Sequence, residues 1–216
     1  MDFALARRNM VEGQIRTNKV TDPLVVEALE ALPREAFVPE ALKNVAYIDE
    51  DLTVGTGRIL MEPMVLARLM QAAAIEETDL ALVIAAATGY EAAAIAKIAS
   101  AVVAIESDLE LHRAAVEHLA EQGADTVSML KGKLATGHPG QGPYDVIFIN
   151  GAAGEVPASL LDQLADGGRL VYVKTGAGTG KAMLVSKIDG VSSETELFDA
   201  NVPAIPEFAT QSQFSF

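Results

Sequence analysis

Short apolar segments alternate with helix-like segments from residue 80 onward, and this alternation constrains the fold more than any other feature. The apolar runs are ALVIAA from Ala81, AVVAIE from Ala101, TVSML from Thr126, DVIFIN from Asp145 and RLVYVK from Arg169. Segments such as EAAAIAKIA and LELHRAAVEHLAEQG separate them. Apolar strands joined by helices are typical of a parallel sheet that is covered on both faces. The sequence therefore predicts an α/β fold with its sheet in residues 79–216.

Residues 1–78 have a different pattern and form a predicted helical and loop cap. Asp22-Pro23 opens a helical run that repeats apolar residues at three- and four-residue spacing, and Pro33 ends it. A loop-like region follows from Val38 to about Arg58, and Pro63 begins a second amphipathic helix. From Ala182 the pattern favours strands and a hairpin. Since no linker divides the chain, we expect one domain over residues 1–216.

Composition excludes several classes of partner. Half of the 216 residues are hydrophobic, which argues against disorder, and the absence of cysteine excludes disulfides and fits a reducing cytoplasm. The net charge of −14 repels nucleic acid and anionic lipid, although solubility alone also explains it. No apolar run reaches the roughly 18 residues of a membrane span. We expect a cytoplasmic protein that binds neither nucleic acid nor membrane, while its oligomeric state stays open.

The first predicted strand runs into IAAATGYEAAAIA, where a turn leads into a helix. Ligands of such sheets bind beyond the carboxyl ends of the strands, where glycines let the backbone approach closely. Only Gly89 is present, so the turn by itself is also consistent with an ordinary connection. The second strand ends at Glu106, which is placed to accept hydrogen bonds from ribose hydroxyls or to be a solvated strand-end glutamate. Together the two features favour an adenosine-type ligand, and the missing GxGxxG argues against NAD.

Other motifs point to no further chemistry. TGAGTGKAM from Thr175 lacks the first glycine of a phosphate loop and the hydroxyl residue after its lysine, so it is interpreted as a glycine-rich connection. His112, His118 and His138 have no metal-ligand spacing, and no nucleophile-elbow sequence supports a hydrolase. We expect no metal site. The methionines Met61, Met64 and Met70 are interpreted as core or loop packing.

Six segments, in order, resemble those of protein-L-isoaspartate O-methyltransferases. They are MVEGQI from Met10, LPREAFVP from Leu32, AYIDEDLTVG from Ala46, TGYEAA from Thr88, YDVIFINGAAGEVP from Tyr144 and LLDQLADGGRLV from Leu160. The resemblance covers nearly the whole chain and is strongest in residues 10–170. It implies a Rossmann-like class I methyltransferase sheet flanked by helices, with an N-terminal helical extension and a final antiparallel strand that QSQFSF could supply.

The activity implied by this resemblance is methyl transfer from S-adenosylmethionine to the isoaspartyl carboxylate of a damaged protein. A carboxylate needs no strong base, so the reaction depends chiefly on alignment and on desolvation of the anion. The implied partner is a protein or peptide with isoaspartyl residues. The alternatives are a non-catalytic protein that uses the same fold as a binding module and a methyltransferase that acts on a small acid or another protein group.

The resemblance also implies site residues. The implied cofactor contacts are Ala85, Ala87, Gly89, Tyr90, Glu106, Leu134 and Asn150. The implied substrate contacts are Asp49 and Arg58. No catalytic residue is assigned, because Met61 stands where the family has a serine. Four further positions depart from the family: Val83 replaces an acidic residue, Ala85 and Ala87 replace glycines, and Lys133 stands where many members have an acid near the adenine.

Overall fold

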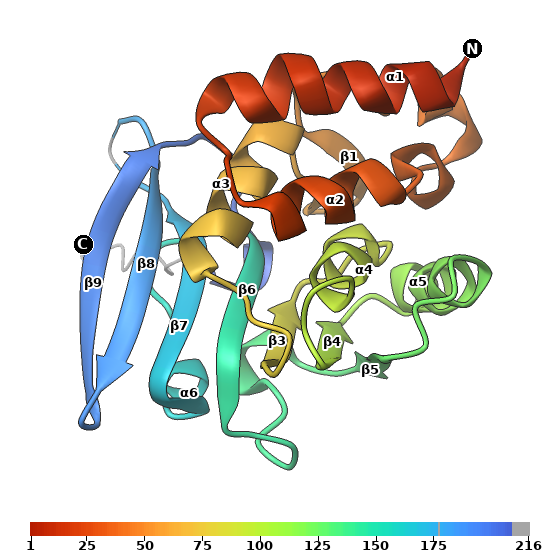
Figure 1. The fold of residues 1–216 in the computed structure, drawn as a ribbon. Coiled ribbons are helices and arrows are strands. Elements are labelled where there is room, and N and C mark those ends of the chain that lie inside the picture. Colours follow the sequence, from red (N-terminus) through yellow and green to blue (C-terminus); the bar gives the residue numbers. More distant parts are fainter. Residues whose placement is uncertain (177, 209–216) are drawn as a thin grey trace, which may run out of the picture.

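The computed structural model describes residues 1–176 and 178–208, and its centre is a seven-stranded sheet. The strand order is β5-β4-β3-β6-β7-β8-β9 (Figure 1). The strands are β3 (Leu80–Ile84), β4 (Ala101–Glu106), β5 (Val127–Lys131), β6 (Tyr144–Ala153), β7 (Leu164–Lys174), β8 (Lys181–Ile188) and β9 (Val191–Asp199). The first five are mutually parallel, whereas β8 and β9 are each antiparallel to their neighbour. The predicted α/β sheet is confirmed, and its strand order reverses at β3.

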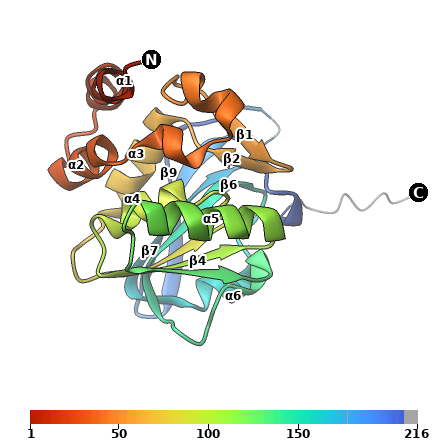
Figure 2. The same ribbon diagram turned by 90° about the vertical axis from the view of Figure 1, so that its right-hand side faces the viewer.

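Helices flank this sheet and lie mostly on one of its faces, and only the shortest of those in the described residues packs against the other. They are α1 (Phe3–Met10), α2 (Pro23–Ala31), α3 (Pro63–Ala73), α4 (Tyr90–Ala96), α5 (Leu109–Glu121) and α6 (Ala158–Leu161). The predicted helix at Asp22-Pro23 is confirmed: the carboxylate of Asp22 caps the N-terminus of α2, and Pro23 occupies its first turn. Figure 2 shows α5 lying along the sheet beside α4. The helices α1 and α2 lie together, farther from the sheet than α4.

The region predicted as a loop between Val38 and Arg58 has more structure than expected. It contains a 3₁₀ segment (Glu40–Val45) and the strand β1 (Leu52–Gly55), which pairs with β2 (Arg58–Leu60). These elements have only three to six residues. Segments of this length are too short to show a period of hydrophobic residues in the sequence. The turn of this β1–β2 hairpin contains Gly57 with a φ of +65°, a conformation that favours glycine. The loop prediction was therefore wrong for the hairpin.

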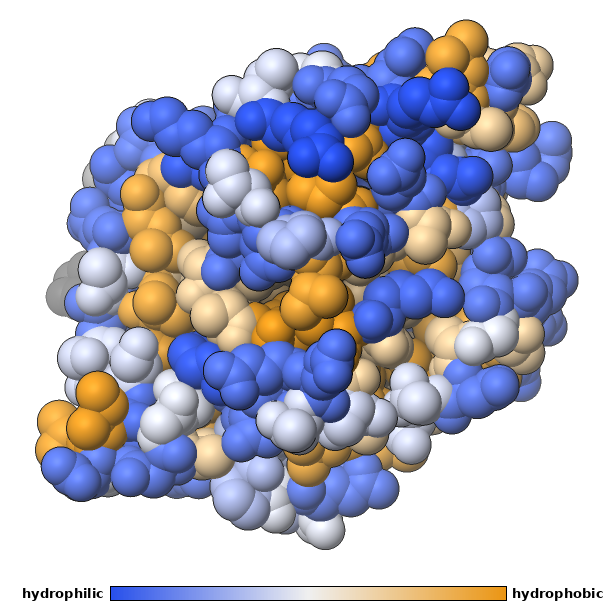
Figure 3. All heavy atoms as spheres, in the orientation of Figure 1, coloured by the Kyte–Doolittle hydropathy of each residue, from blue (hydrophilic) through white to orange (hydrophobic). Residues whose placement is uncertain are grey.

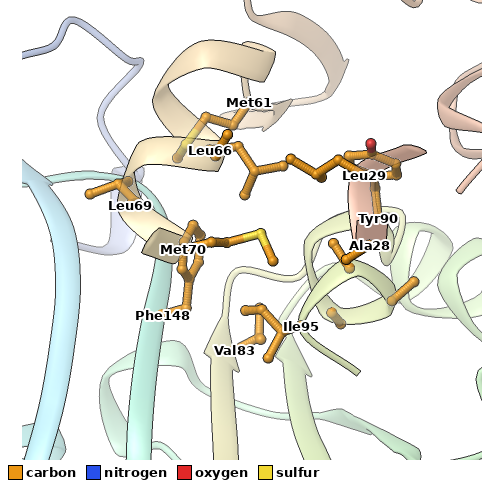
Figure 4. Close-up of a cluster of buried hydrophobic side chains, with 14 of the residues drawn as sticks. Ala28, Leu29, Met61, Leu66, Leu69, Met70, Val83, Tyr90, Ile95 and Phe148 are labelled. Atoms are coloured by element: carbon orange, nitrogen blue, oxygen red, sulfur yellow. The ribbon is translucent and has the colours of Figure 1, made fainter. Parts of the chain in front are cut away.

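Side chains alternate between two buried clusters, one on each face of the sheet. Val83 points toward the cap and joins a cluster with α2, α3 and α4, whereas Leu82 and Ile84 join the opposite cluster. Figure 4 shows Met61, Met70 and Tyr90 in the first cluster with Val83 and Phe148 of the sheet. Met61 and Met70 are fully buried, so their interpretation as packing residues is confirmed. The cap and the sheet share one hydrophobic core.

The face in Figure 3 shows hydrophilic residues around hydrophobic groups near its centre, and a further hydrophobic group at the tip of the β8–β9 hairpin, where Ile188 and Val191 are exposed. Within residues 1–176 and 178–208, the helices are too short and too polar to cross a membrane. The strand predicted at QSQFSF lies outside the described residues. Within the described residues, the antiparallel strands of the sheet are β8 and β9.

Candidate functional site

The loop after β3 has the backbone of a glycine-rich turn although it is built from alanines. Ala85 and Ala87 have positive φ values of 61° and 48°, and Gly89, the N-cap of α4, has a φ of 95°. An alanine in this region costs about 1–2 kcal/mol because its Cβ approaches the following carbonyl oxygen. The methyl groups of Ala85 and Ala87 are completely buried. The loop thus keeps a strained conformation that glycine would adopt freely.

Glu106 lies beside this loop, as the parallel pairing of β3 and β4 requires. Its Oε2 accepts a hydrogen bond from the Ala87 amide at 3.0 Å, and its Oε1 accepts from the amides of Ser107 at 2.7 Å and Asp108 at 2.9 Å. The side chain has no exposed surface. The expected proximity of loop and acid is therefore observed, but the carboxylate is bound by the chain itself.

Arg58 completes the surroundings of Glu106. Its Nε lies 3.1 Å from Oε1 and 3.0 Å from Oε2 of Glu106, and only 3% of its side chain is exposed. The same guanidinium donates from Nη2 to Oε1 of Glu207 at 2.6 Å and from Nη1 to Oε2 at 3.2 Å. Partial burial raises the pKa of Glu207, but hydrogen bonds from Arg58 and Ser107 outweigh this effect and lower the pKa to about 2. One arginine thus joins two carboxylates from distant parts of the chain.

Residues 203–208 bring Glu207 to this position and cover the strand ends. The Ala152 amide donates to the Pro203 carbonyl at 3.0 Å, and the Ile205 amide donates to the Ala152 carbonyl at 2.8 Å. Ile205 and Phe208 are buried in the same cluster as Ala85 and Leu134. The 203–208 segment therefore lies over the crevice that the sequence predicts for a ligand. No local pattern identified its role.

The remaining residues implied as cofactor contacts are also engaged within the chain. The Asn150 amide group donates to the carbonyl of Ile59 at 3.3 Å and to that of Ala85 at 3.2 Å, which ties β6 to both the β1–β2 hairpin and the loop. Leu134 is 1% exposed in the second core cluster. Asn150 and Leu134 thus border the crevice, as their positions imply.

Tyr90 points away from the crevice into the core beneath the cap. Its ring packs edge-on against Phe37 with 5.3 Å between centroids, and the Arg34 guanidinium lies 5.1 Å from its centroid. Burial raises the pKa of the tyrosine hydroxyl, which has no hydrogen-bond partner among the described residues. A cofactor contact through this hydroxyl is inconsistent with the position of the ring.

A buried polar group beneath the cap was not expected from the sequence. Arg34 is completely buried and donates to the carbonyls of Ala46 and Met61, each at 2.6 Å. Glu91 is also completely buried; its Oε1 accepts from the Met61 amide at 3.1 Å, and its Oε2 has no partner among the described residues. Burial raises the pKa of Glu91 to about 7 despite the opposing effects of backbone hydrogen bonds and Arg34.

Met61 and Asp49 lie on the cap side of the site. Met61 is 0% exposed, so it fills the core rather than lining a surface. The carboxylate of Asp49 is exposed and accepts from the Met64 amide at 3.2 Å, in the first turn of α3. Nearby, burial raises the pKa of Asp51 to about 6, and burial together with neighbouring carboxylates raises the pKa of Glu62 to about 7. Asp49 thus belongs to an acidic rim, whereas Arg58, the other implied substrate residue, lies on Glu106.

This arrangement does not fit a bound adenosine cofactor. Glu106 would have to turn its oxygens toward a ribose, yet Arg58 and backbone amides already occupy both of them. Ile205 and Phe208 fill the apolar side of the crevice next to Leu134. Among the described residues there is also no cluster of His, Cys, Asp and Glu that could hold a metal ion. The crevice has the predicted position and loop backbone. Arg58, Ile205 and Phe208 occupy the space beside Glu106 and Leu134, while a cavity of about 300 Å³ remains at the strand ends beside Ser107, Lys131 and Lys133.

Comparison with known sequences gives a consistent result. A family profile described as Protein-L-isoaspartate(D-aspartate) O-methyltransferase (PCMT) matches residues 6–203. The chain is 40% identical over 179 residues to Protein-L-isoaspartate O-methyltransferase 2 of Anaeromyxobacter sp. (strain Fw109-5), covering 83% of this chain and 74% of that protein. It is 35% identical over 205 residues to the protein-L-isoaspartate O-methyltransferase of Koribacter versatilis (strain Ellin345), covering 94% and 92%.

Solved structures show the same fold. A beta-aspartate methyltransferase (PCMT) from Plasmodium falciparum, in complex with S-adenosyl-L-homocysteine, has a TM-score of 0.82 at 18% identity, covering 93% of this chain and 98% of that chain. A protein-L-isoaspartate O-methyltransferase has a TM-score of 0.81 at 23% identity, covering 92% and 65%. At these identities the structures establish the fold alone, whereas the profile and the relatives cover both cap and sheet. The chain therefore belongs to the protein-L-isoaspartate O-methyltransferase family.

Proposed function

We propose that this protein is an S-adenosylmethionine-dependent methyltransferase that esterifies isoaspartyl carboxylates in damaged proteins. The observation that carries the proposal is the profile match over residues 6–203, because it includes the cap as well as the ligand-binding sheet. The left-handed loop backbone at Ala85, Ala87 and Gly89 supports it, since this backbone brings the loop amides close to the strand ends. The proposed partner is a protein or peptide that contains isoaspartyl residues.

The side chains packed around Glu106 limit how the cofactor could bind. Arg58 and residues 203–208 occupy the space beside Glu106, so the cofactor requires another arrangement of these residues. Met61, at the position of the family serine, has no hydroxyl and no exposed surface, so it makes no contact with a substrate. Any contribution of the chain to the reaction then rests on binding, orientation and exclusion of water.

A second candidate function is a non-catalytic binding module. The observation that favours it is the full set of internal hydrogen bonds on Glu106, together with the buried methyl groups of Ala85 and Ala87. A protein that no longer binds the cofactor would retain its fold, since these contacts hold the hairpin, the loop and the sheet together.

One assay separates the two functions. The full chain is incubated with methyl-labelled S-adenosylmethionine and an isoaspartyl peptide, and the same peptide with normal aspartate serves as the control. Label that enters only the isoaspartyl peptide as a base-labile ester supports the methyltransferase. If no ester forms at high protein concentration, the proposed activity is wrong. Failure to bind S-adenosylhomocysteine in calorimetry as well would leave the binding module as the better account.

A further inference from the structure

Arg58 links two carboxylates that differ sharply in exposure. The side chain of Glu106 is 0% exposed and that of Arg58 is 3% exposed, whereas that of Glu207 is 37% exposed. The Ser107 hydroxyl also donates to Glu207 at 2.7 Å. Glu106 is thus fixed in the interior, and Glu207 binds the Arg58 guanidinium on the side that faces the solvent.

The 203–208 segment that carries Glu207 fits closely against the mouth of the crevice. A Cβ added to Gly57 would lie 2.4 Å from Cγ of Pro206, and one added to Gly151 would lie 2.7 Å from Cγ1 of Ile205. The segment therefore packs directly on the turn of the β1–β2 hairpin and on the end of β6. Among the described residues, the segment makes two backbone hydrogen bonds to β6, and both are with Ala152.

We propose that the 203–208 segment is a latch: the Arg58–Glu207 pair holds it over Glu106, and an adenosine-type ligand enters only when it leaves. The proposal rests on the proposed function, because it assumes that the crevice takes such a ligand. When Glu207 is withdrawn, Arg58 loses its solvent-side partner and can turn its guanidinium outward into solvent. Glu106 then keeps its amide donors from Ala87, Ser107 and Asp108, and its Oε2, which has one of these amides, regains acceptor capacity toward a ribose hydroxyl.

The anchors of the latch are compatible with opening. The outer ion pair is partly exposed, so solvent and salt weaken it more than the buried Arg58–Glu106 contact. Ile205 and Phe208 supply the apolar part of the closure, and one strand-like bridge at Ala152 supplies the backbone part. A short surface segment with these contacts can detach without unfolding the sheet beneath it.

The experiment compares wild type with Glu207→Gln in the full chain. Calorimetric titration with S-adenosylhomocysteine should give about tenfold tighter binding to Glu207→Gln, the equivalent of about 1.4 kcal/mol. Hydrogen exchange should be faster at the Ile205 amide in the variant, which reports opening directly. Glu12→Gln removes the same charge from an exposed ion pair with Arg16 on the N-terminal helices and should change neither measurement.

The outcomes separate the latch from the proposed function. Tighter binding together with faster exchange supports the latch, even if neither protein methylates an isoaspartyl peptide, in which case only the function fails. Equal binding by wild type and Glu207→Gln overturns the latch, and wild-type methyl transfer would still uphold the function. No binding by either protein, or unchanged exchange at Ile205, also overturns the latch.

Discussion

The Arg34 guanidinium donates to the Met61 carbonyl at 2.6 Å and so ties together two parts of the cap, the segment after α2 and the segment that leads into α3. The same side chain donates to the Ala46 carbonyl at 2.6 Å, and it is completely buried. A buried arginine that satisfies two distant carbonyls fixes the path of the chain between them. The cap therefore depends on Arg34.

Replacing Arg34 with methionine should destabilise the protein strongly. Arg34→Met keeps most of the apolar volume but leaves the Ala46 and Met61 carbonyls without a donor, at about 1–3 kcal/mol each. We expect the free energy of unfolding in urea to fall by about 3 kcal/mol. Arg16→Met, which removes a half-exposed arginine, should lower it by less than about 1 kcal/mol. Equal effects of the two substitutions would contradict this role of Arg34.

Restoring two glycines in the loop should improve ligand binding at little cost in stability. Ala85→Gly with Ala87→Gly relieves the left-handed strain but adds freedom to the unfolded chain, so the unfolding free energy should stay within about 1 kcal/mol of wild type. Removing two buried methyl groups should strengthen S-adenosylhomocysteine binding in calorimetry. Ala93→Gly, within α4, should cost about 1 kcal/mol and leave binding unchanged. Unchanged affinity of the double variant would show that the loop methyls do not limit binding.

Restoring the family serine at position 61 should damage the core. Met61 is fully buried among Leu29, Leu66 and their neighbours (Figure 4), so Met61→Ser leaves a cavity and buries a hydroxyl. We expect a loss of about 2–5 kcal/mol in thermal or chemical unfolding and no gain in methyl transfer. Met64→Ser, at a half-buried position, should cost clearly less. A serine variant of full stability would mean that the core adjusts around position 61.

Glu91 should make stability depend on pH. Its pKa is raised from 4.5 to about 7 in the folded protein, so between these values the native state binds more protons than the unfolded state. Stability should therefore fall as pH rises from 4.5 to 7, by about 3 kcal/mol from this group. Glu91→Gln removes that contribution, so it should gain stability relative to wild type between pH 5 and pH 8 in urea titrations.

The control for this pH effect is Glu110→Gln, at an exposed position on α5. Its difference from wild type should be nearly constant with pH. Asp51 and Glu62 also have raised pKa values, so some decline with pH should persist in Glu91→Gln. If the difference between Glu91→Gln and wild type is the same at pH 5 and pH 8, Glu91 does not titrate in this range.

The sequence by itself determined the sheet and the neighbourhood of the crevice. Apolar runs of strand length between helical segments predict parallel strands, and parallel pairing brings the loop after β3 next to Glu106 at the end of β4. Positions 85 and 87 inherit a left-handed backbone from the turn geometry, whatever residue occupies them. These features are local or follow from strand order, so a pattern of residues suffices to predict them.

Only the tertiary structure decided what occupies that crevice. Arg58, Glu106 and Glu207 lie far apart in the sequence and no pattern links them, yet they form one network of hydrogen bonds. Glu91 likewise meets the Met61 amide only after the cap folds onto the sheet, and Arg34 meets the Met61 carbonyl only after distant parts of the cap come together. Contacts of this kind depend on the three-dimensional path of loops and short turns. Periodicity and spacing do not encode that path, because burial is a property of the whole fold.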